Sequence, residues 1–467
     1  MADFSYIPVT GINKTKIYLI QSGTNASSVA KNIINTINYL GDFNKVSLDD
    51  NASPTIPAHP AVGYITKLGI YDIGSGYTYL VVGEKDQDAN NTGYNNRVII
   101  NSKMKAGDSI EVVSGRNAGL NYNANGENGT IYFTGGYKTE NGDDAGKSIF
   151  KGTNQTGNWT IFSGDQNGIF YTTNGNNTLS IGNGDNLIIT GTGNNKITLG
   201  TGKNNITSNG HDTIKSAGVG QAIKLSGGSS TINFGEESNV NSNSANNIIT
   251  VGNKSTVTGG EQDKIYSAKD DDNITLIKGK SQTVNIKKEL TFLNGTGDSQ
   301  INVGHATLFG ANNLNMNLNA NKADKETLYV ASSGNETLDG SKSSVALHIF
   351  ANNDTKGNGK ITVTGGNGND TIVGGSGVAT FTGNKGNNLF GFIKGSSTGQ
   401  TTITDFSASA GNKIGLYNYG LNSDSMKKVL DAATYANGDT TLMVDTTKIV
   451  LQHVDVKSLN VAQFEYS

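Results

Sequence analysis

Residues 172–216 read TTNGNNTLS, IGNGDNLII, TGTGNNKIT, LGTGKNNIT and SNGHDTIKS, a gapless series that repeats every nine residues, with the last block shortened. In each block a Gly precedes an Asn or Asp by two positions, and an aliphatic residue follows two positions later. A nonapeptide is too short to bury its apolar side chain alone. That side chain leaves water only by stacking on the same position of a neighbouring turn. The repeat therefore predicts a β-solenoid.

Each repeated position has an expected structural role. The glycines Gly175, Gly184, Gly193, Gly202 and Gly210 are expected to supply the positive-φ corners of tight turns. The amides, one per coil, are expected to hydrogen-bond along the stack as a ladder formed by Asn177, Asn186, Asn195 and Asn204. The inward positions are expected to be Leu179, Ile188, Ile197 and Ile206. A disordered Gly/Asn-rich tract is the alternative, but such tracts do not keep an aliphatic residue in register over five blocks.

The composition favours short strands and turns over helices. The chain has 467 residues with 62 Gly, 4 Pro, 34% hydrophobic residues and a net charge of -3. Its two arginines, Arg97 and Arg116, both precede the repeats, so nucleic acid is not an expected partner. The absence of cysteine excludes disulfides and thiolate metal sites. We expect no transmembrane segment and no cleaved amino-terminal signal peptide.

Changes in texture along the chain predict three regions. Residues 1–151 are expected to form an amino-terminal β-rich domain with one amphipathic helix over 26–40, capped by Ser27 or Ser28. Residues 152–400 are expected to form the solenoid of degenerate nonapeptide-type coils. Residues 401–467 are expected to form a capping module with a short helix over 423–433, because an open solenoid end exposes unpaired strand edges. The expected fold is mainly β, a right-handed parallel β-solenoid or β-roll.

The clearest motif is GGNGNDTIV at residues 365–373. It resembles the calcium-binding nonapeptide GGxGxDxUx of the RTX proteins, in which carbonyls of the glycine turn and aspartates hold calcium between stacked loops. The tail strengthens this resemblance, since TTITDFSASAGNKIGLYNYG at 401–420 is similar to the segment that follows the repeats in RTX-type substrates of type I secretion. In that family an uncleaved carboxyl-terminal signal directs export, which implies a bacterial, exported and surface-associated protein.

The chain also departs from the RTX pattern. Loops that face one another in an RTX β-roll are eighteen residues apart, which places Asn352 and Asn388 opposite Asp370. The intervening block has Ala379 at its acid position, and four of the five early blocks have Asn there. Each lost carboxylate removes a full charge from a calcium site. The resemblance therefore implies few calcium ions, with one weak site formed by Gly366, Gly368, Asp370 and Asn388, while most coils are expected to use amide ladders.

The candidate catalytic residues do not form a recognisable site. The histidines are scattered, Asp270, Asp271 and Asp272 suit a solvated turn, and the trio His211, Asp212 and Lys215 suits satisfied turn residues. We expect no catalytic residues and no enzymatic activity. The expected function is that of an exported structural protein that assembles with itself on or around the cell, as an S-layer subunit or a biofilm-matrix filament. A carbohydrate-binding adhesin that contacts cell-surface polysaccharide is the alternative, and a secreted polysaccharide-active enzyme is the third hypothesis.

Overall fold

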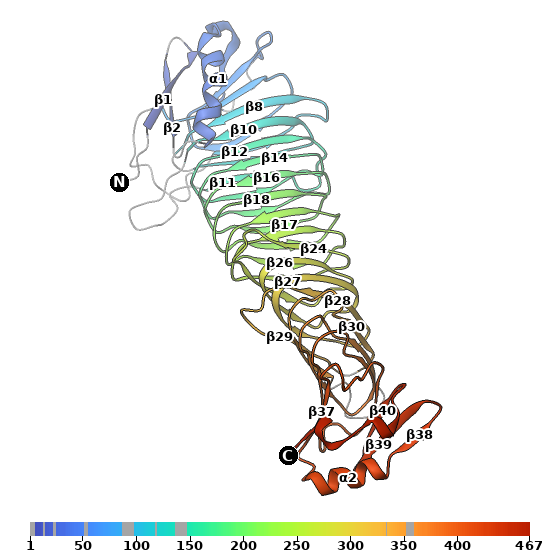
Figure 1. The fold of residues 1–467 in the computed structure, drawn as a ribbon. Helices are drawn as coiled ribbons and strands as arrows, with labels where there is room; N and C mark the ends of the chain where they lie inside the picture. The colour runs from blue at the N-terminus through green and yellow to red at the C-terminus, as the bar shows by residue number, and fades with distance from the viewer. Residues whose placement is uncertain are drawn as a thin grey trace. The chain divides into compact units, whose positions relative to one another are not determined.

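The computed structural model describes residues 5–12, 15–21, 25–50, 55–85, 98–116, 119–135, 147–332, 334–351 and 359–467. The chain divides into two compact units, residues 1–244 and 245–467. Both are built from short parallel strands stacked as successive turns (Figure 1). With 49% strand, two helices and about 18 turns, the structure confirms a mainly β, parallel solenoid fold. Neither α-helix of the described residues is long and apolar enough to cross a membrane.

Unit 1 has two strand faces, and each strand pairs in parallel with the next strand of its own face. On one face the strands are β3 (Lys45–Ser47), β4 (Val62–Ile65), β6 (Tyr79–Val82), β8 (Ser109–Ser114), β10 (Asn128–Phe133), β12 (Trp159–Ser163), β14 (Thr178–Ile181), β16 (Lys196–Leu199), β18 (Thr213–Ser216) and β20 (Thr231–Phe234). On the other they are β5 (Gly69–Ile73), β7 (Val98–Ser102), β9 (Leu120–Asn123), β11 (Ser148–Lys151), β13 (Gly168–Tyr171), β15 (Leu187–Ile189), β17 (Asn205–Ser208), β19 (Ala222–Leu225) and β21 (Asn239–Ser242).

The parallel pairing of unit 1 starts long before the nonapeptide blocks. It begins at β3 and passes without a break from β10 to β12, across residue 151. The early coils hold larger side chains than the repeats do. Tyr122, Phe150 and Trp159 lie inside them, with ring centroids 4.9 to 6.1 Å apart. Wider coils with aromatic interiors lack the nine-residue period, which is why the sequence there does not show a repeat.

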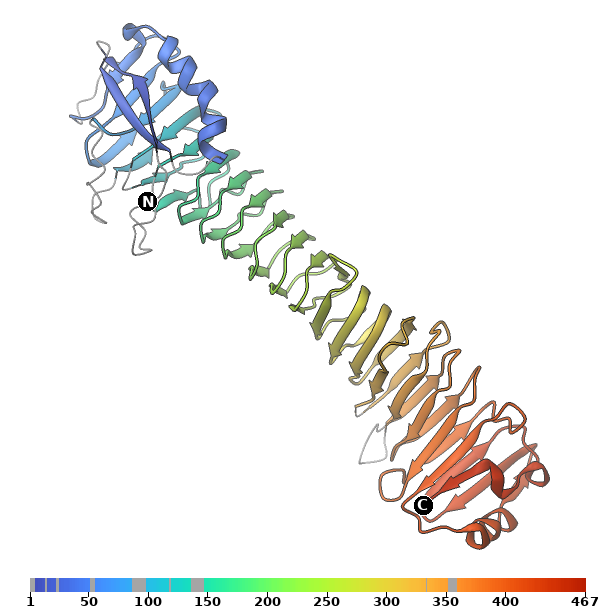
Figure 2. The ribbon, with the colours of Figure 1, turned by 60° about the vertical axis from the view of Figure 1, so that its left-hand side comes forward.

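A hairpin and a helix cover the outside of the first coils (Figure 2). Strands β1 (Ser5–Thr10) and β2 (Lys16–Gln21) pair antiparallel, and α1 (Asn25–Tyr39) lies beside them. Helical spacing puts its apolar residues on one face, where Ile33, Ile34 and Ile37 are buried against Tyr64 and Val81 of the solenoid. The predicted helix is therefore present. Because it already includes Asn25, Ser27 and Ser28 lie within its first turn, and the cap predicted at either serine is wrong.

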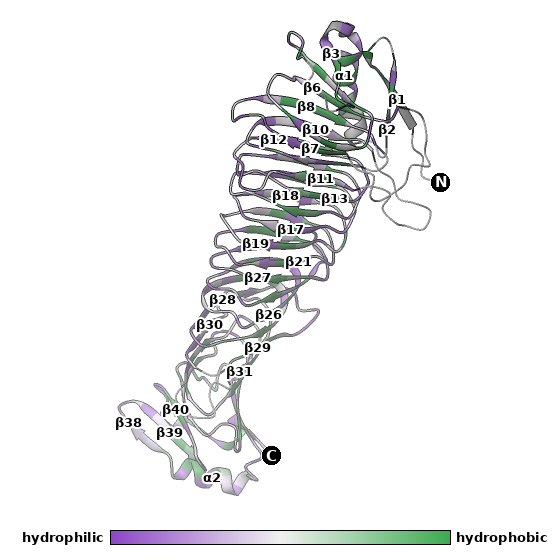
Figure 3. Cartoon of the chain, turned by 180° about the vertical axis from the view of Figure 1, so that it is seen from behind, coloured by the Kyte–Doolittle hydropathy of each residue, from purple (hydrophilic) through white to green (hydrophobic). Residues whose placement is uncertain are grey.

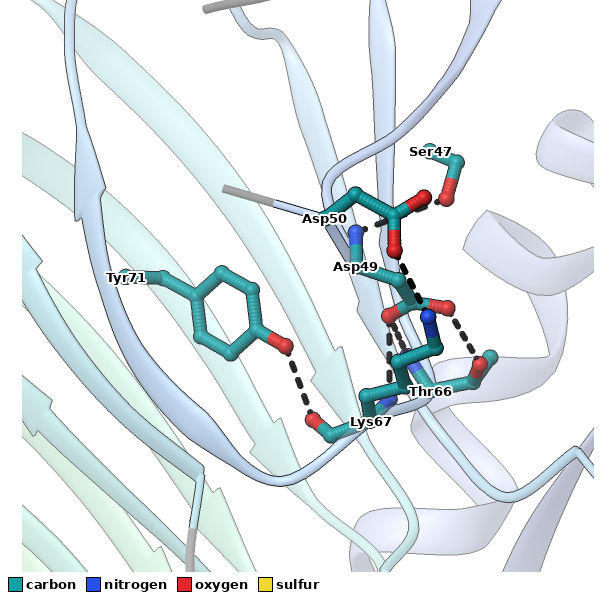
Figure 4. A network of polar contacts seen from close by, with 6 residues as sticks. All are labelled: Ser47, Asp49, Asp50, Thr66, Lys67 and Tyr71. Carbon is teal, nitrogen blue, oxygen red and sulfur yellow. Dashed lines mark hydrogen bonds and ion pairs between the residues drawn. The ribbon is translucent and has the colours of Figure 1, made fainter. Parts of the chain in front are cut away.

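The loops that follow β3 and β4 are joined by a polar network (Figure 4). The Asp49 carboxylate accepts backbone N–H bonds from Thr66 at 2.6 Å and Lys67 at 2.9 Å, and a hydroxyl bond from Thr66 at 2.5 Å. The Lys67 ammonium pairs with Asp50 at 2.6 Å, and the Tyr71 hydroxyl donates to the Lys67 carbonyl. Burial raises the pKa of Tyr71, with the Asp49 charge adding to the rise. The network joins the loop after β3 to the loop after β4 and therefore stabilises the contact between successive coils.

Unit 2 also has two strand faces. Face 1 holds β22 (Ile248–Val251), β24 (Lys264–Ser267), the first parts of β26 (Thr283–Leu293) and β27 (Gly297–Phe309), β28 (Leu314–Ala320), β30 (Glu336–Asp339), β32 (Lys360–Thr364), β34 (Val378–Thr382), β36 (Gln400–Ile403) and β40 (Thr447–Leu451). Face 2 holds β23 (Ser255–Thr258), β25 (Asn273–Ile277), the second parts of β26 and β27, β29 (Thr327–Val330), β31 (Leu347–Ala351), β33 (Thr371–Gly374), β35 (Leu389–Ile393), β37 (Lys413–Tyr417) and β41 (Phe464–Tyr466).

The carboxyl-terminal residues continue the solenoid of unit 2 and add a small module to it. Helix α2 (Ser423–Asp431) starts at a capping box between Asn422 and Ser425 and buries Met426. The strands β38 (Thr434–Ala436) and β39 (Asp439–Val444) form an antiparallel meander with β40. Because β40 and β41 also pair in parallel with β36 and β37, the tail supplies the last rungs of both faces.

Candidate functional site: the amide ladders and the Asp370 turn

The first amide ladder runs through the interior of unit 1 at the turns before β14 and β16. The backbone N–H of Asn177 donates to Oδ1 of Asn195 at 3.1 Å, and the Asn177 side-chain amide donates to the same oxygen at 2.9 Å. The partners are eighteen residues apart, one full coil of two blocks. The Asn177 amide also donates to the carbonyl of Gly175 at 2.7 Å. Both asparagines are buried, so this bonding satisfies polar groups that water cannot reach.

A second ladder repeats this geometry at the other turn of each coil. Asn186 donates through its backbone and its side chain to Oδ1 of Asn204, at 3.2 and 2.9 Å. Asn204 donates in the same way to Oε1 of Gln221, seventeen residues on, at 3.3 and 2.8 Å. The longer Gln side chain therefore extends the ladder across a coil that is one residue shorter. The aliphatic positions Leu179, Ile188, Ile197 and Ile206 are all buried between the two faces.

The repeat glycines are needed for close approach and not for positive φ. None of the five has a left-handed φ, contrary to the expectation from the sequence. A Cβ on Gly193 would lie 2.2 Å from the carbonyl oxygen of Gly175, and a Cβ on Gly202 would lie 2.2 Å from that of Gly184. The glycines of successive coils are thus stacked directly on one another, at a distance that leaves no room for a side chain.

A carboxylate occupies one position of the first ladder. Asp212 is buried, and its Oδ1 accepts the backbone and side-chain N–H groups of Asn195 at 3.1 and 2.7 Å. Its Oδ2 accepts hydroxyl bonds from Thr190 and Ser208, both at 2.7 Å. Four donors therefore satisfy the buried charge. The predicted trio does not converge, because Asp212 points inward while His211 is exposed, with Nδ1 accepting from the Ser229 N–H.

Asp370 of the GGNGNDTIV motif holds the same ladder position in unit 2. Its Oδ1 accepts the Leu347 N–H at 2.8 Å, its Oδ2 accepts the Gly366 N–H at 2.6 Å, and its own N–H donates to Oδ1 of Asn388 at 2.9 Å. Asn388 in turn donates to Asn412. Burial raises the pKa of Asp370 to about 6, although the two backbone donors oppose that shift. The site is therefore a buried, hydrogen-bonded turn.

One predicted neighbour of Asp370 is wrong. The residue aligned with it on the preceding rung is Leu347, twenty-three residues earlier, because β31 pairs with β33 from His348 to Thr371. The eighteen-residue rule pointed to Asn352, which lies outside the described residues. The coil between β31 and β33 is longer than two nonapeptides, so counting blocks fails on that side. On the other side the rule holds, since Asn388 is eighteen residues on.

The hydrogen bonds around Asp370 repeat those of the amide ladder. The described residues contain no group of three or more acidic or histidine side chains placed to hold a metal ion. Gly366 contributes an N–H to the carboxylate instead of a carbonyl, and a Cβ on Gly368 would lie 2.4 Å from the Ala346 nitrogen. Both glycines are thus explained by contact with the neighbouring rung. Calcium binding at Gly366, Gly368, Asp370 and Asn388 stays a prediction.

The run Asp270, Asp271 and Asp272 is only partly solvated. Asp270 is exposed and pairs with Lys287 at 2.6 Å, whose hydrogen bond lowers the pKa of Asp270. Asp271 is exposed, whereas Asp272 is buried and its Oδ2 accepts the Lys269 N–H at 2.6 Å. Asp272 stands two residues before the inward Ile274, as the ladder amides stand before their aliphatic residues. The expectation of a fully solvated turn is therefore wrong for Asp272.

The structure brings together a charged group that the sequence did not reveal. His305 is 2% exposed, with Nε2 3.6 Å from Glu289 and Nδ1 3.4 Å from Asp324. Neither ring nitrogen has a hydrogen-bond partner among the described residues. Lys325 bonds Glu289 at 2.8 Å, and this bond is the main cause of the lowered pKa of Glu289. The long strands β26 and β27 place Glu289 beside His305, a pairing that no nine-residue spacing predicts.

The His305 group can pair charges, but it is poorly placed for catalysis on a polysaccharide. Its imidazole is buried, so a chain on the surface has no access to the ring. The contacts of His305 with Glu289 and Asp324 hold the loop at 321–326 against β27. The Lys322 N–H, which donates to the Gly304 carbonyl, holds the same loop.

The exposed side of face 1 in unit 2 carries a further amide ladder. The Asn302 amide donates to Asn285 at 2.9 Å, and the Asn319 amide donates to Asn302 at 3.3 Å. A parallel bond joins Asn315 to Asp298 at 2.8 Å. We call Asn285, Asn302 and Asn319 the amide row. Figure 3 shows hydrophobic residues gathered on the strands, with hydrophilic and neutral ones in the turns. No protein-family model and no curated protein matches the chain.

Proposed function

We propose that this chain is an exported structural protein that assembles with copies of itself on or around the bacterial cell, as an S-layer subunit or a biofilm-matrix filament. The observation that carries the proposal is the amide row. Three outward-facing amides, of which Asn302 is exposed and the other two are half-buried, stand at the fixed spacing of the sheet and are joined by hydrogen bonds. An amide has two donor hydrogens and two acceptor lone pairs, so each rung keeps hydrogen-bonding capacity toward solvent. A regular row of uncharged amides suits contacts that repeat from copy to copy.

Assembly is tested on the purified full chain by sedimentation velocity over a concentration series and by negative-stain microscopy, with calcium and with a chelator. We expect ordered lattices or filaments in at least one condition. Monomer folding is followed separately by circular dichroism, because calcium at subunit contacts would affect assembly without affecting the fold. A chain that stays monomeric at every concentration, with and without calcium, would refute the proposal.

Export rests on the resemblance of residues 401–467 to the tails of RTX-type substrates of type I secretion. Deleting 461–467 from the full chain should trap it in the cytoplasm of its host. Because that deletion also removes β41 and the buried Phe464, it can impair folding. Phe464→Ser is the matched control, since it disturbs the same strand and keeps the rest of the tail. We expect the deletion to be retained and Phe464→Ser to be exported. Equal export of both would contradict a signal in the last seven residues.

A carbohydrate-binding adhesin is the second candidate, and the amide row favours it too. Amide donors and acceptors in a fixed array can bond the hydroxyl groups of an extended polysaccharide. The two functions separate on glycan arrays, where an adhesin gives saturable binding that Asn302→Ala weakens, whereas an assembly protein gives none. An enzyme is the third hypothesis, and turnover of a polysaccharide by the purified full chain would support it.

A further inference from the structure

A continuous apolar row runs along the outer surface of face 2 in unit 2. Its members are aligned on successive strands by the parallel register: Ile277, Leu293, Phe309, Val330, Phe350 and Val373. All six alternate with inward core residues and therefore face outward. Phe309 and Phe350 are 40% and 41% exposed, although both are large apolar side chains. Beyond Val373 the register meets Gly391 and Gly415. The Tyr417 ring lies within contact distance of the space that a side chain at either glycine would occupy, and so extends the row.

The strip formed by this row and its neighbours holds no Asp, Glu, Lys or Arg at the described strand positions that compose it. The outward positions two residues earlier on the same strands are Thr275, Thr291, Thr307, Leu328, His348 and Thr371. Face 1 of the same unit differs, because its outward positions hold the amide row together with Lys264, Lys360 and Lys448. Single exposed apolar residues are ordinary on protein surfaces, but a contiguous aligned strip marks an interaction site.

We propose that the apolar row is the contact by which one copy of this chain packs face to face on a second copy. This inference rests on the proposed self-assembly and names its surface. An uncharged strip offers nothing to a charged polymer, whereas the same strip on a second copy is apolar and uncharged as well. The spacing between strands is about 4.8 Å in any sheet, so ridges and grooves of two such faces stay in step along their whole length. A two-fold axis through the middle of the row makes the contact self-complementary.

The size of the strip determines the strength expected of one contact. Six strands at about 4.8 Å and two outward positions about 6.6 Å apart define roughly 350 to 400 Å² on each copy. A pair of copies would bury about 700 to 800 Å², which is less than the about 1,200 Å² of a stable complex. The isolated pair should therefore be weak and reversible. Other contacts of the same assembly would hold the copies close together and raise their effective concentration, so that this weak contact stays formed.

The test compares two double variants of the full chain by sedimentation velocity. Phe309→Asp with Phe350→Asp puts two charges into the row, and Ile248→Asp with Val378→Asp puts two at residues that are 41% and 42% exposed on face 1. Each pair replaces outward strand residues, so a loss of β-propensity affects both alike. We expect the row variant to raise the dissociation constant of self-association by about 10-fold or more, with the face 1 variant unchanged. Phe309→Leu with Phe350→Leu should keep most of the affinity.

The outcomes distinguish this inference from the proposed function. Assembly that survives both charges in the row would overturn the inference and leave self-assembly standing on another surface. No self-association in wild type at any concentration would refute both. Equal weakening by the row and face 1 variants, with unchanged melting temperatures, would show that charge in general opposes assembly, and would also overturn a specific role for the row. Kosmotropic sulfate should strengthen the wild-type contact, as expected of apolar burial.

Discussion

Replacing Asp370 by Asn should stabilise the protein above neutral pH, which is the opposite of what a calcium ligand would show. The carboxyl is 1% exposed, and burial raises its pKa to about 6. In the unfolded chain an Asp titrates near pH ~3.9. The folded state therefore holds the proton more tightly. The stability contributed by this group is fully present below about pH 4 and is lost as pH rises through about 6.

The size of this effect follows from the pKa difference. About two units correspond to about 3 kcal/mol between pH 4 and pH 8, as an upper bound. The amide of the Asp370→Asn variant would stay neutral at every pH and keep an oxygen for the Leu347 N–H, but it would lose the acceptor of the Gly366 N–H. That loss costs about 1 kcal/mol. The net gain expected at pH 8 is about 1 to 2 kcal/mol, and the slope of stability between pH 4 and pH 6 should become smaller.

Urea unfolding of wild type and Asp370→Asn at pH 4, 5, 6, 7 and 8 measures the effect, with hydrogen exchange of the Leu347 and Gly366 amides reporting locally. Asp185→Asn is the matched control, because this carboxylate also accepts a backbone N–H from the next coil, that of Lys203 at 2.7 Å, but is exposed. It should not reproduce the gain in stability at pH 8, because the carboxylate that it removes is not buried. If Asp370→Asn lowered stability at pH 8 in calcium, and a chelator removed the difference, the ladder account of Asp370 would be refuted in favour of a metal site.

Three further predictions concern unit 1. Ile197→Asp should lower the melting temperature followed by circular dichroism, because it loses about 1.5 to 3 kcal/mol of side-chain burial and buries a charge. The outward Thr198→Asp should not lower it, and equal melting temperatures of the two variants would contradict the inward placement of Ile197. Gly193→Ala should destabilise by about 1 to 3 kcal/mol through its clash with Gly175, whereas Gly74→Ala, with open space at Cβ, should be tolerated; a neutral Gly193→Ala would count against the stacked turns. Exchanging all four ladder amides (Asn177, Asn186, Asn195 and Asn204) for Asp places like charges about 5 Å apart in successive coils and should make folding depend on calcium, whereas wild type should keep its β signal in a chelator; wild-type unfolding on chelation would contradict the ladder account.

The fold could be predicted where the coil length is constant and not where it varies. Between Asn177 and Asn204 each coil has two blocks, so the sequence period equals the spatial period and places amides and aliphatic residues correctly. In the aromatic early coils, and at β26 and β27 with 11 and 13 residues, the period is lost. The pairing of Glu289 with His305, and the order of the apolar row, depend on the register of those irregular coils. Neither the Glu289–His305 pairing nor the apolar row can therefore be predicted from the sequence alone.

The role of the repeat glycines could not be predicted from the sequence, for a different reason. Their recurrence was visible, but a Gly demanded by φ and a Gly demanded by the absence of Cβ look identical in a sequence. Only the position of the Gly175 carbonyl beneath Gly193 decides between the two. The same ambiguity affects GGNGNDTIV, where glycines that suit a calcium turn are equally explained by contact with residues 343–346.

The direction of the amide ladders explains how neighbouring amides can satisfy a buried carboxylate. In the two buried ladders of unit 1 the N–H groups point toward the carboxyl-terminal coil, so the amide dipoles add head to tail along the stack, as peptide dipoles do in a helix. At the positive end of such a column, the residue on the next coil must accept the hydrogen bonds that the last amide donates. Asp212 receives both N–H groups of Asn195 there, and Asp263 receives both of Asn247. A column of neutral amides thus acts on a carboxylate as the first turn of a helix does, and supplies charge complementarity from side chains that carry no charge of their own.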